Sequence, residues 1–185
     1  YLFRIYHNFY NNHCIFAAIV LELPYEPRRD LMHNTNIICL GDSFTRGFGV
    51  RKKENWISQS YPENTTLINA GINGDTTSGM LARFSRDVIE HRPDYVLITG
   101  GINDFIVGSS LDIPKNNYMA MAHQAAAQRI TPIIGIAPGF SAGQIRSDWA
   151  AFSDFGKVSE KHLLLRLWLH SFASTFHFPV FDFYA

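Results

Sequence analysis

Cysteine is scarce in this sequence, and long apolar runs are missing. Only two cysteines, Cys14 and Cys39, occur among 185 residues, too few for a disulfide framework in a domain of this size. We therefore expect both to be reduced, structural residues. No stretch approaches the ~20 apolar residues that a membrane-spanning helix needs. The most apolar candidate, residues 14–21, is short and has only Arg4 as an upstream fixed positive charge, so a signal peptide is not expected.

Basic tracts are also missing. Lys plus Arg and Asp plus Glu each number 16, so the formal net charge is zero. No stripe of Arg or Lys is interleaved with aromatic residues, so nucleic acid is not expected as a partner. With 46% hydrophobic and 17% charged residues, the composition is typical of one globular domain with a buried core. A cytoplasmic location is expected, with secretion or the periplasm as the alternative, and the oligomeric state stays open.

The first 34 residues differ from the rest of the chain. They are rich in Tyr, Phe, Asn and His and show no sustained period of 2 or 3.6. We interpret residues 1–34 as an N-terminal extension, either foreign to the natural chain or poorly ordered, with Met32 as a candidate natural start. Deleting residues 1–31 should then leave thermal stability nearly unchanged. Residues 35–185 form the expected domain.

From residue 36 onward, apolar strands alternate with helices. This alternation predicts an α/β fold with a parallel five-stranded sheet covered by helices on both faces. Ligands of such folds bind beyond the carboxyl ends of the strands, so the loops at that edge are the candidates for a site. Strands are expected over residues 36–40, 66–70, 94–99, 131–137 and 179–183, and helices over residues 78–91, 114–128 and 159–176.

The loop after the first strand carries Gly41, Asp42 and Ser43. A serine between a strand and a helix points its hydroxyl out of the sheet edge, and its backbone N–H lies at a helix start, where donors are unpaired. The structural alternative is a serine that only caps the helix. Taken alone, this loop leaves both interpretations open.

The next two loops add hydrogen-bond donors. Gly71 and Gly74 follow the second strand and let backbone N–H groups approach a substrate closely, although a simple tight turn explains them as well. After the third strand, Gly101 precedes Asn103, whose side-chain amide can donate to a developing negative charge. An Asx turn is the structural alternative for Asn103.

The combination is more specific than its parts. Ser43, Gly74 and Asn103 are spaced by 31 and 29 positions, each about one βαβ unit, so all three are expected at one sheet edge. Together they offer a nucleophile and three donors: the N–H of Ser43, the N–H of Gly74 and the amide of Asn103. Acyl transfer needs such donors because a tetrahedral oxyanion forms.

Three sequence blocks resemble those of the SGNH/GDSL hydrolases, which include lysophospholipase-like and arylesterase-like enzymes. Gly41-Asp42-Ser43-Phe44 resembles block I, Asn73-Gly74-Asp75-Thr76 block II, and Gly101-Ile102-Asn103-Asp104 block III, from about residue 37 onward and in the family's order. The resemblance implies a flavodoxin-like three-layer sandwich, no metal or cofactor, and hydrolysis of carboxylic esters or thioesters. It also implies that Ser43 is the nucleophile and that Ser43, Gly74 and Asn103 bind the oxyanion. Gly41, Asp42, Gly101 and Asp104 would support them.

The family's last block, D-x-x-H, supplies the histidine that takes the serine proton. This chain ends at Ala185, before such a block. We therefore expect the domain to be C-terminally incomplete, without the catalytic Asp and His, and to be inactive or weakly active as an esterase. Extending the chain through a D-x-x-H segment should restore turnover.

None of the histidines in the chain is expected to replace the missing base. The one D-x-x-H string, residues 30–33, precedes the first strand, so it lies about 17 Å away at the opposite sheet edge. Asp182 is expected to be structural rather than the acid of a triad. The remaining candidates are expected at the wrong edge or in surface and interhelix positions: His91, His123, His162, His170 and His177.

Two other classes of function compete with the hydrolase. The same loops would also suit a flavodoxin-like module that binds a phosphate or another ligand without catalysis, and a non-catalytic interaction domain would keep only the fold. A fluorophosphonate probe separates them, because it labels an activated serine. Four aromatic residues are candidates for an apolar acyl pocket, with the core as the alternative: Phe44, Phe48, Trp56 and Phe105.

Overall fold

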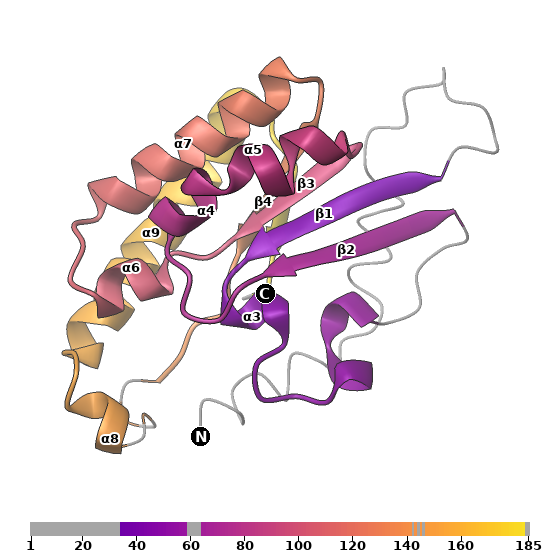
Figure 1. The fold of residues 1–185 in the computed structure, drawn as a ribbon. Coiled ribbons are helices and arrows are strands. Elements are labelled where there is room, and N and C mark those ends of the chain that lie inside the picture. The colour runs from indigo at the N-terminus through magenta and orange to yellow at the C-terminus, as the bar shows by residue number, and fades with distance from the viewer. Residues whose placement is uncertain (1–33, 59–63, 142, 144, 146, 184–185) are drawn as a thin grey trace.

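The computed structural model describes residues 34–58, 64–141, 143, 145 and 147–183. Five parallel strands form one sheet in the order β2-β1-β3-β4-β5 (Figure 1). This order places the first strand inside the sheet, with the second strand on one side and the third on the other. The strands are β1 (Thr35–Gly41), β2 (Thr65–Gly71), β3 (Tyr95–Thr99), β4 (Thr131–Ile136) and β5 (Val180–Asp182).

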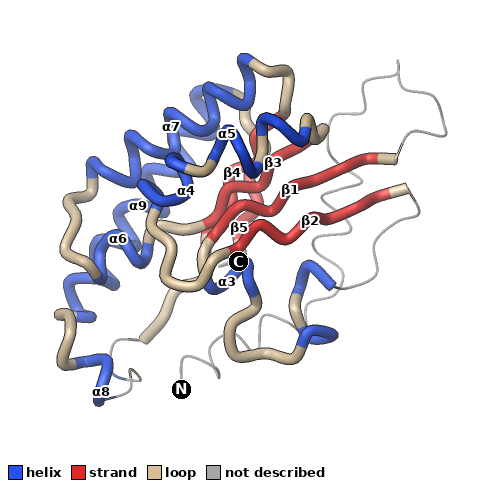
Figure 2. Tube along the Cα trace, viewed as in Figure 1, coloured by secondary structure: helices blue, strands red, loops and turns tan. Residues whose placement is uncertain are grey.

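The longer helices cover one face of the sheet, and the shorter helix α3 lies over the other face with two 3-10 turns (Figures 1 and 2). The parallel five-stranded α/β fold predicted from the sequence is therefore confirmed. The helices are α3 (Ser43–Arg46), α4 (Thr77–Ala82), α5 (Phe84–Asp87), α6 (Ile102–Ile106), α7 (Asp112–Ala127), α8 (Ser147–Ala150) and α9 (Phe155–Phe176). The 3-10 turns are η1 (Lys52–Glu54), η2 (Trp56–Ser58) and η3 (Ile89–His91).

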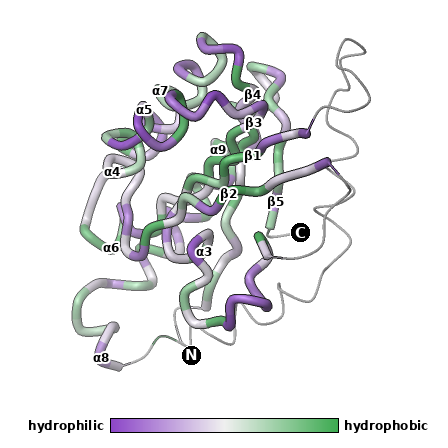
Figure 3. The backbone as a smooth tube through the Cα atoms, turned by 45° about the vertical axis from the view of Figure 1, so that its right-hand side comes forward, coloured by the Kyte–Doolittle hydropathy of each residue, from purple (hydrophilic) through white to green (hydrophobic). Residues whose placement is uncertain are grey.

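Two apolar cores lie on the two faces of the sheet, because successive strand residues point to opposite sides. On the face covered by α4, α7 and α9, Ile38 and Leu40 of β1 pack with residues of β3 and β4. On the other face, Ile37 and Cys39 pack with Phe44. The central strands are accordingly hydrophobic over most of their length (Figure 3). Burial raises the pKa of the Cys39 thiol, as expected for a structural cysteine.

One expected element differs from the structure. The single helix predicted over residues 78–91 is wrong, because the chain forms α4, α5 and η3 in succession (Figure 2). Arg83, between α4 and α5, has φ −100° and ψ 3°, outside the helical region. The apolar period continues through this break, which is why the sequence pattern did not reveal it.

The expected N-terminal extension, residues 1–34, lies outside the described residues except for Asn34, so its separation from the core stays a prediction. The same holds for Cys14 and for the D-x-x-H string at residues 30–33. Among the described helices, none combines the length and the hydropathy of a membrane-spanning segment.

Candidate active site

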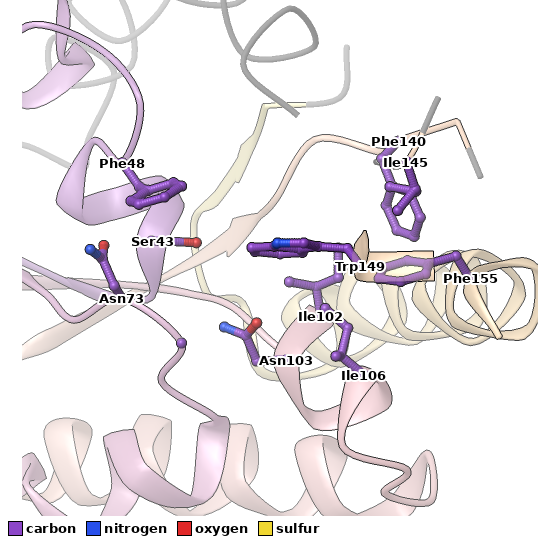
Figure 4. A pocket seen from close by; sticks show the side chains of 11 residues that line it. Ser43, Phe48, Asn73, Ile102, Asn103, Ile106, Phe140, Ile145, Trp149 and Phe155 are labelled. Atoms are coloured by element: carbon purple, nitrogen blue, oxygen red, sulfur yellow. The ribbon is translucent and has the colours of Figure 1, made fainter. Parts of the chain in front are cut away.

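A cavity of about 330 Å³ opens at the carboxyl ends of β1, β2 and β3. From β1 the chain continues to β2 on one side, whereas from the neighbouring β3 it continues to β4 on the other side. The cavity therefore lies at the topological switch point, where ligands of open α/β sheets bind. Its polar wall consists of Ser43, Asn73, Gly74 and Asn103. Its apolar wall consists of Ile102, Ile106, Phe140, Ile145, Trp149 and Phe155, with Phe48 also lining the cavity (Figure 4).

Ser43 is the first residue of α3, directly after β1. The Asp42 carboxylate caps this helix by accepting from the Phe44 N–H at 2.9 Å. Gly41 is required before it, because a Cβ there would overlap Thr45 and come within 2.7 Å of the Thr99 carbonyl oxygen. The tight strand-to-helix turn therefore leaves the Ser43 hydroxyl pointing into the cavity (Figure 4).

Gly74 and Asn103 reach the same cavity from the next two loops. Gly74 has φ +76°, a conformation that L side chains rarely adopt, so glycine suits this turn. Asn103 lies in the first turn of α6, and its Nδ2 donates to the backbone carbonyl of Asp75 at 2.8 Å. An amide nitrogen carries two N–H groups, so this bond fixes the side chain and leaves a second donor for a ligand. The expected convergence of Ser43, Gly74 and Asn103 is therefore observed.

Asp104 joins the second loop to the third. Its two carboxylate oxygens accept from the Thr77 N–H at 2.9 Å and from the Thr77 hydroxyl at 2.6 Å. Both residues are buried, and burial is the main reason that the pKa of Asp104 is raised. Asn117 of α7 donates to the same Thr77 hydroxyl at 2.9 Å. Asp104 therefore connects the second loop to the third through Thr77.

Asp42 is the most perturbed acidic group of the site. Burial raises its pKa to about 7, and the negative charges of Asp75 and Asp104 add to the effect. Its Oδ1 bonds to the Phe44 N–H, whereas its Oδ2 has no hydrogen-bond partner among the described residues. A carboxyl group held this way ionises near neutral pH, directly beside Ser43.

The sequence analysis missed most of the apolar wall. Phe140 and Ile145 belong to the segment after β4, Trp149 lies on α8, and Phe155 starts α9. The sequence did contain a signal for this segment. Pro138-Gly139 ends the fourth strand, so the residues that follow lie at the same sheet edge as the other loops. Of the four aromatic residues considered for an acyl pocket, only Phe48 lines the cavity. The other three are buried in the two cores: Phe44, Trp56 and Phe105.

The described histidines do not line this cavity. His162 is buried on α9, where burial lowers its pKa to about 4. His123 packs edge-on against Phe176, with ring centroids 4.7 Å apart. His170 lies 3.0 Å from the carboxylate of Asp182, which Arg166 also contacts, and a structural role for Asp182 stays a prediction. The remaining two are at the opposite sheet edge, as expected: His91 before β3 and His177 before β5.

The sheet order and the placement of Ser43, Gly74 and Asn103 at three neighbouring strand ends are those of the SGNH class of proteins. In the described part of the chain, no three His, Cys, Asp or Glu side chains gather as a metal site would require. Residues 39–185 match the sequence profile of the GDSL-like Lipase/Acylhydrolase family, so the chain belongs to this family.

Known relatives agree with this assignment. The chain is 33% identical over 91 residues to an arylesterase of Vibrio mimicus, covering 46% of each chain. It is 28% identical over 101 residues to the thioesterase 1/protease 1/lysophospholipase L1 of Escherichia coli (strain K12), covering 53% of this chain and 49% of the relative. The matches therefore span about half the length of these curated relatives.

Solved structures show the same fold. The crystal structure of a member of the lipolytic protein G-D-S-L family from Veillonella parvula DSM 2008 superposes with a TM-score of 0.66. It is 23% identical in sequence, and the match covers 81% of this chain and 78% of that one.

Proposed function

We propose that this protein is a serine ester hydrolase that cleaves small carboxylic esters or thioesters, with Ser43 as the nucleophile. The observation that carries the proposal is that Ser43, Gly74 and Asn103 line one cavity at the switch point of the sheet. A serine hydroxyl within a cluster of N–H donors suits acyl transfer, whereas a phosphate site has no use for an exposed nucleophile.

In the proposed reaction, the Ser43 oxygen attacks the acyl carbon and its proton passes to a base. The carbonyl oxygen becomes an oxyanion, which accepts from the N–H groups of Ser43 and Gly74 and from the Asn103 amide. Collapse of this intermediate expels the alcohol or thiol, which leaves with a proton, and water then hydrolyses the acyl-serine. Donors aimed at the oxyanion stabilise it more than they stabilise the ground-state carbonyl, which is what lowers the barrier.

The cavity supports a small, apolar substrate. Its volume of about 330 Å³ lies at the lower end of the range of small-molecule sites, roughly 300–1,000 Å³. The apolar wall offers aromatic and branched surfaces but no charge, so it suits an alkyl or aryl group. The names of two relatives, an arylesterase and a thioesterase, indicate chemistry of the same kind.

None of the described histidines is proposed as the base. His162 and His170 both lie on α9, one buried and the other paired with Asp182, and neither lines the cavity with Ser43. A serine hydroxyl without a proton acceptor is a weak nucleophile. Since no described histidine lies beside Ser43, we expect slow turnover of esters, with a residual rate from the donors and binding. Replacing His162 or His170 by Gln should not lower that rate further, and a loss in either variant would identify the base.

The proposal is tested with an activated short-chain ester, p-nitrophenyl acetate, and with a long incubation in a fluorophosphonate probe. The Ser43→Ala variant should lose both turnover and labelling, since it lacks the attacking oxygen. The matched control is Ser85→Ala, which removes an exposed serine of α5 and should change neither. Equal turnover and labelling of the Ser43→Ala variant and the parent would contradict the proposal. Inorganic phosphate bound at this site without labelling would favour a binding module instead.

A further inference from the structure

Arg83 is an almost fully buried arginine between α4 and α5. Its side chain is only 9% exposed, and its guanidinium group contacts three acceptors. Nε donates to Asp75 Oδ2 at 2.8 Å, Nη1 to Asp87 Oδ2 at 2.8 Å, and Nη2 to the backbone carbonyl of Gly41 at 3.1 Å. Removing an arginine from water requires such complete pairing, because an unpaired buried charge is strongly destabilising.

Two of these acceptors belong to different loops of the polar wall. Gly41 is the last residue of β1 and lies two residues before Ser43. Asp75 directly follows Gly74, and its backbone carbonyl accepts the hydrogen bond from Asn103. A continuous series of hydrogen bonds therefore runs from the Gly41 carbonyl through Arg83 to Asp75 and on to Asn103. It connects all three loops that carry the proposed oxyanion donors.

The backbone near Arg83 has two features that fit the ion pair between Arg83 and Asp75. The helical pattern breaks at Arg83, although the sequence favours a continuous helix through it. The second feature is Gly79, since a Cβ at this helical position would overlap the Asp75 carboxylate. A glycine inside a helix is unfavourable by roughly 1 kcal/mol relative to alanine. Both features give up local helix stability and keep the Asp75–Arg83 ion pair in place.

We infer that Arg83, acting through Asp75, is a positioning residue that holds the Ser43, Gly74 and Asn103 donors at their mutual distances. This inference rests on the proposed function of the same site. A planar guanidinium group can hold two acceptors in fixed directions at once, which the single ammonium group of lysine cannot do. Donors must lie within about 3 Å of the oxyanion, so small shifts between the loops should affect the transition state more than the bound ester.

The first experiment compares the Arg83→Lys and Asp75→Asn variants with the parent, using p-nitrophenyl acetate. We expect kcat to fall about ten- to a hundredfold, with KM changed by less than about threefold, because the donors act mainly in the transition state. The matched control is Arg86→Lys, since Arg86 contacts the same Asp87 but neither loop. A Tm measured for each variant separates misplacement of the loops from unfolding. An unchanged kcat in both folded variants would overturn the inference.

A double-mutant cycle tests whether Arg83 acts through the donors. In an Asn103→Ala background, the Arg83→Lys change should lower kcat by a smaller factor than in the parent, because one of the three donors that Arg83 positions is gone. Equal factors in the two backgrounds would contradict the inference. If the Asn103→Ala change itself leaves kcat unchanged, the proposed function fails rather than the role of Arg83.

The Gly79→Ala variant keeps the inference testable if the Arg83→Lys variant does not fold. Its new methyl group displaces the Asp75 carboxylate, while alanine favours the helix more than glycine does. We expect a lower kcat in a protein that remains folded. Parental kcat in the Gly79→Ala variant, with the Asp75→Asn variant also at the parental value, would show that the ion pair does not position the site.

Discussion

The polar and apolar walls of the Ser43 cavity are built in different ways. The polar wall comes from loops at the ends of the three adjacent strands β1, β2 and β3, and buried polar contacts such as Thr77–Asp104 connect those loops. The apolar wall comes from α6, α8, the start of α9 and the segment after β4. Its described contacts are between rings, such as Phe140 and Phe155, whose centroids are 6.0 Å apart.

This difference follows from what each wall is proposed to do. Hydrogen bonds are directional, so donors for an oxyanion need fixed positions and therefore a rigid framework of strand ends and buried polar contacts. Apolar contacts depend on area and shape and tolerate small shifts. We therefore expect changes in the polar wall to affect kcat, and changes in the apolar wall to affect KM and the choice of ester.

The largest effect is expected from the polar wall. In a chain extended through a D-x-x-H segment, the Asn103→Ala variant should lose about 10²- to 10³-fold in kcat towards p-nitrophenyl acetate, the usual scale for one oxyanion donor. Asn116→Ala is the matched control, because Asn116 is exposed on α7 and does not line the cavity. It should stay within about twofold of the parent. Equal losses in the two variants would show that the donors are wrongly assigned.

The next effect concerns the buried acid beside Ser43. The pKa of Asp42 is raised to about 7 in the folded protein, above its ordinary value of 3.8. Between these values the unfolded chain ionises Asp42 and the folded protein does not, so Asp42 makes folding less favourable as pH rises from about 4 to 7. We expect the Asp42→Asn variant to gain stability over the parent by about 4 kcal/mol between about pH 4 and pH 8.

This gain is measured as the difference between the urea unfolding free energies of the Asp42→Asn variant and the parent at each pH. Taking the difference removes the contribution of His162, whose lowered pKa gives the opposite trend: stability falls as pH drops from about 6.5 to 4. Glu90→Gln, at an exposed position, is the control and should show no such gain. A difference that does not change with pH would show that Asp42 is not perturbed.

A smaller effect is expected from the apolar wall. Trp149 is 38% exposed and faces the cavity from α8, so the Trp149→Ala variant removes contact area without opening the core. KM for p-nitrophenyl butyrate should rise about tenfold, which corresponds to about 1.4 kcal/mol, while Tm and kcat stay near the parental values. The control is Phe152→Ala, since Phe152 is 83% exposed and does not line the cavity. A loss of kcat with unchanged KM would contradict the division between the walls.

The smallest effect is expected one contact away from the polar wall. Asn117 donates to Thr77 at 2.9 Å and to Ser78 at 3.0 Å, so the Asn117→Ala variant should lose about 1 kcal/mol of stability in urea unfolding. Because the Thr77–Asp104 bonds remain, kcat should stay within about twofold. The control is Asn116→Ala, at the neighbouring exposed position, which should change neither stability nor kcat. A large loss of kcat in the Asn117→Ala variant would show that Asn117 of α7 also holds the polar wall in place.

Much of the polar wall could be predicted from the sequence. The apolar strands and their alternation with helices specify a parallel sheet, and a parallel sheet brings every strand end to one edge. Ser43, Gly74 and Asn103 directly follow such strands, so their convergence follows from local order and spacing. Glycine suits Gly74 because φ there is +76°, whereas at Gly41 a Cβ would meet Thr45 and the Thr99 carbonyl oxygen of another strand.

The contacts that hold the site together could not be predicted in this way. Arg83 and the Gly41 carbonyl are 42 positions apart, and Asn103 and Asp75 are 28 apart. The predicted helix is interrupted at Arg83, the residue whose side chain bonds to these distant partners. The apolar wall was missed for the same reason, since Trp149 carries no local signal that it faces Ser43.

The sequence by itself determined the fold class, the sheet edge that carries the site and the three residues proposed for the oxyanion, because backbone preference and hydrophobic period are local properties. Only the tertiary structure decided which buried charges pair, which aromatic side chains enter the core and which line the cavity. Those outcomes depend on the free energy of burying groups that meet only after the strands and helices have packed.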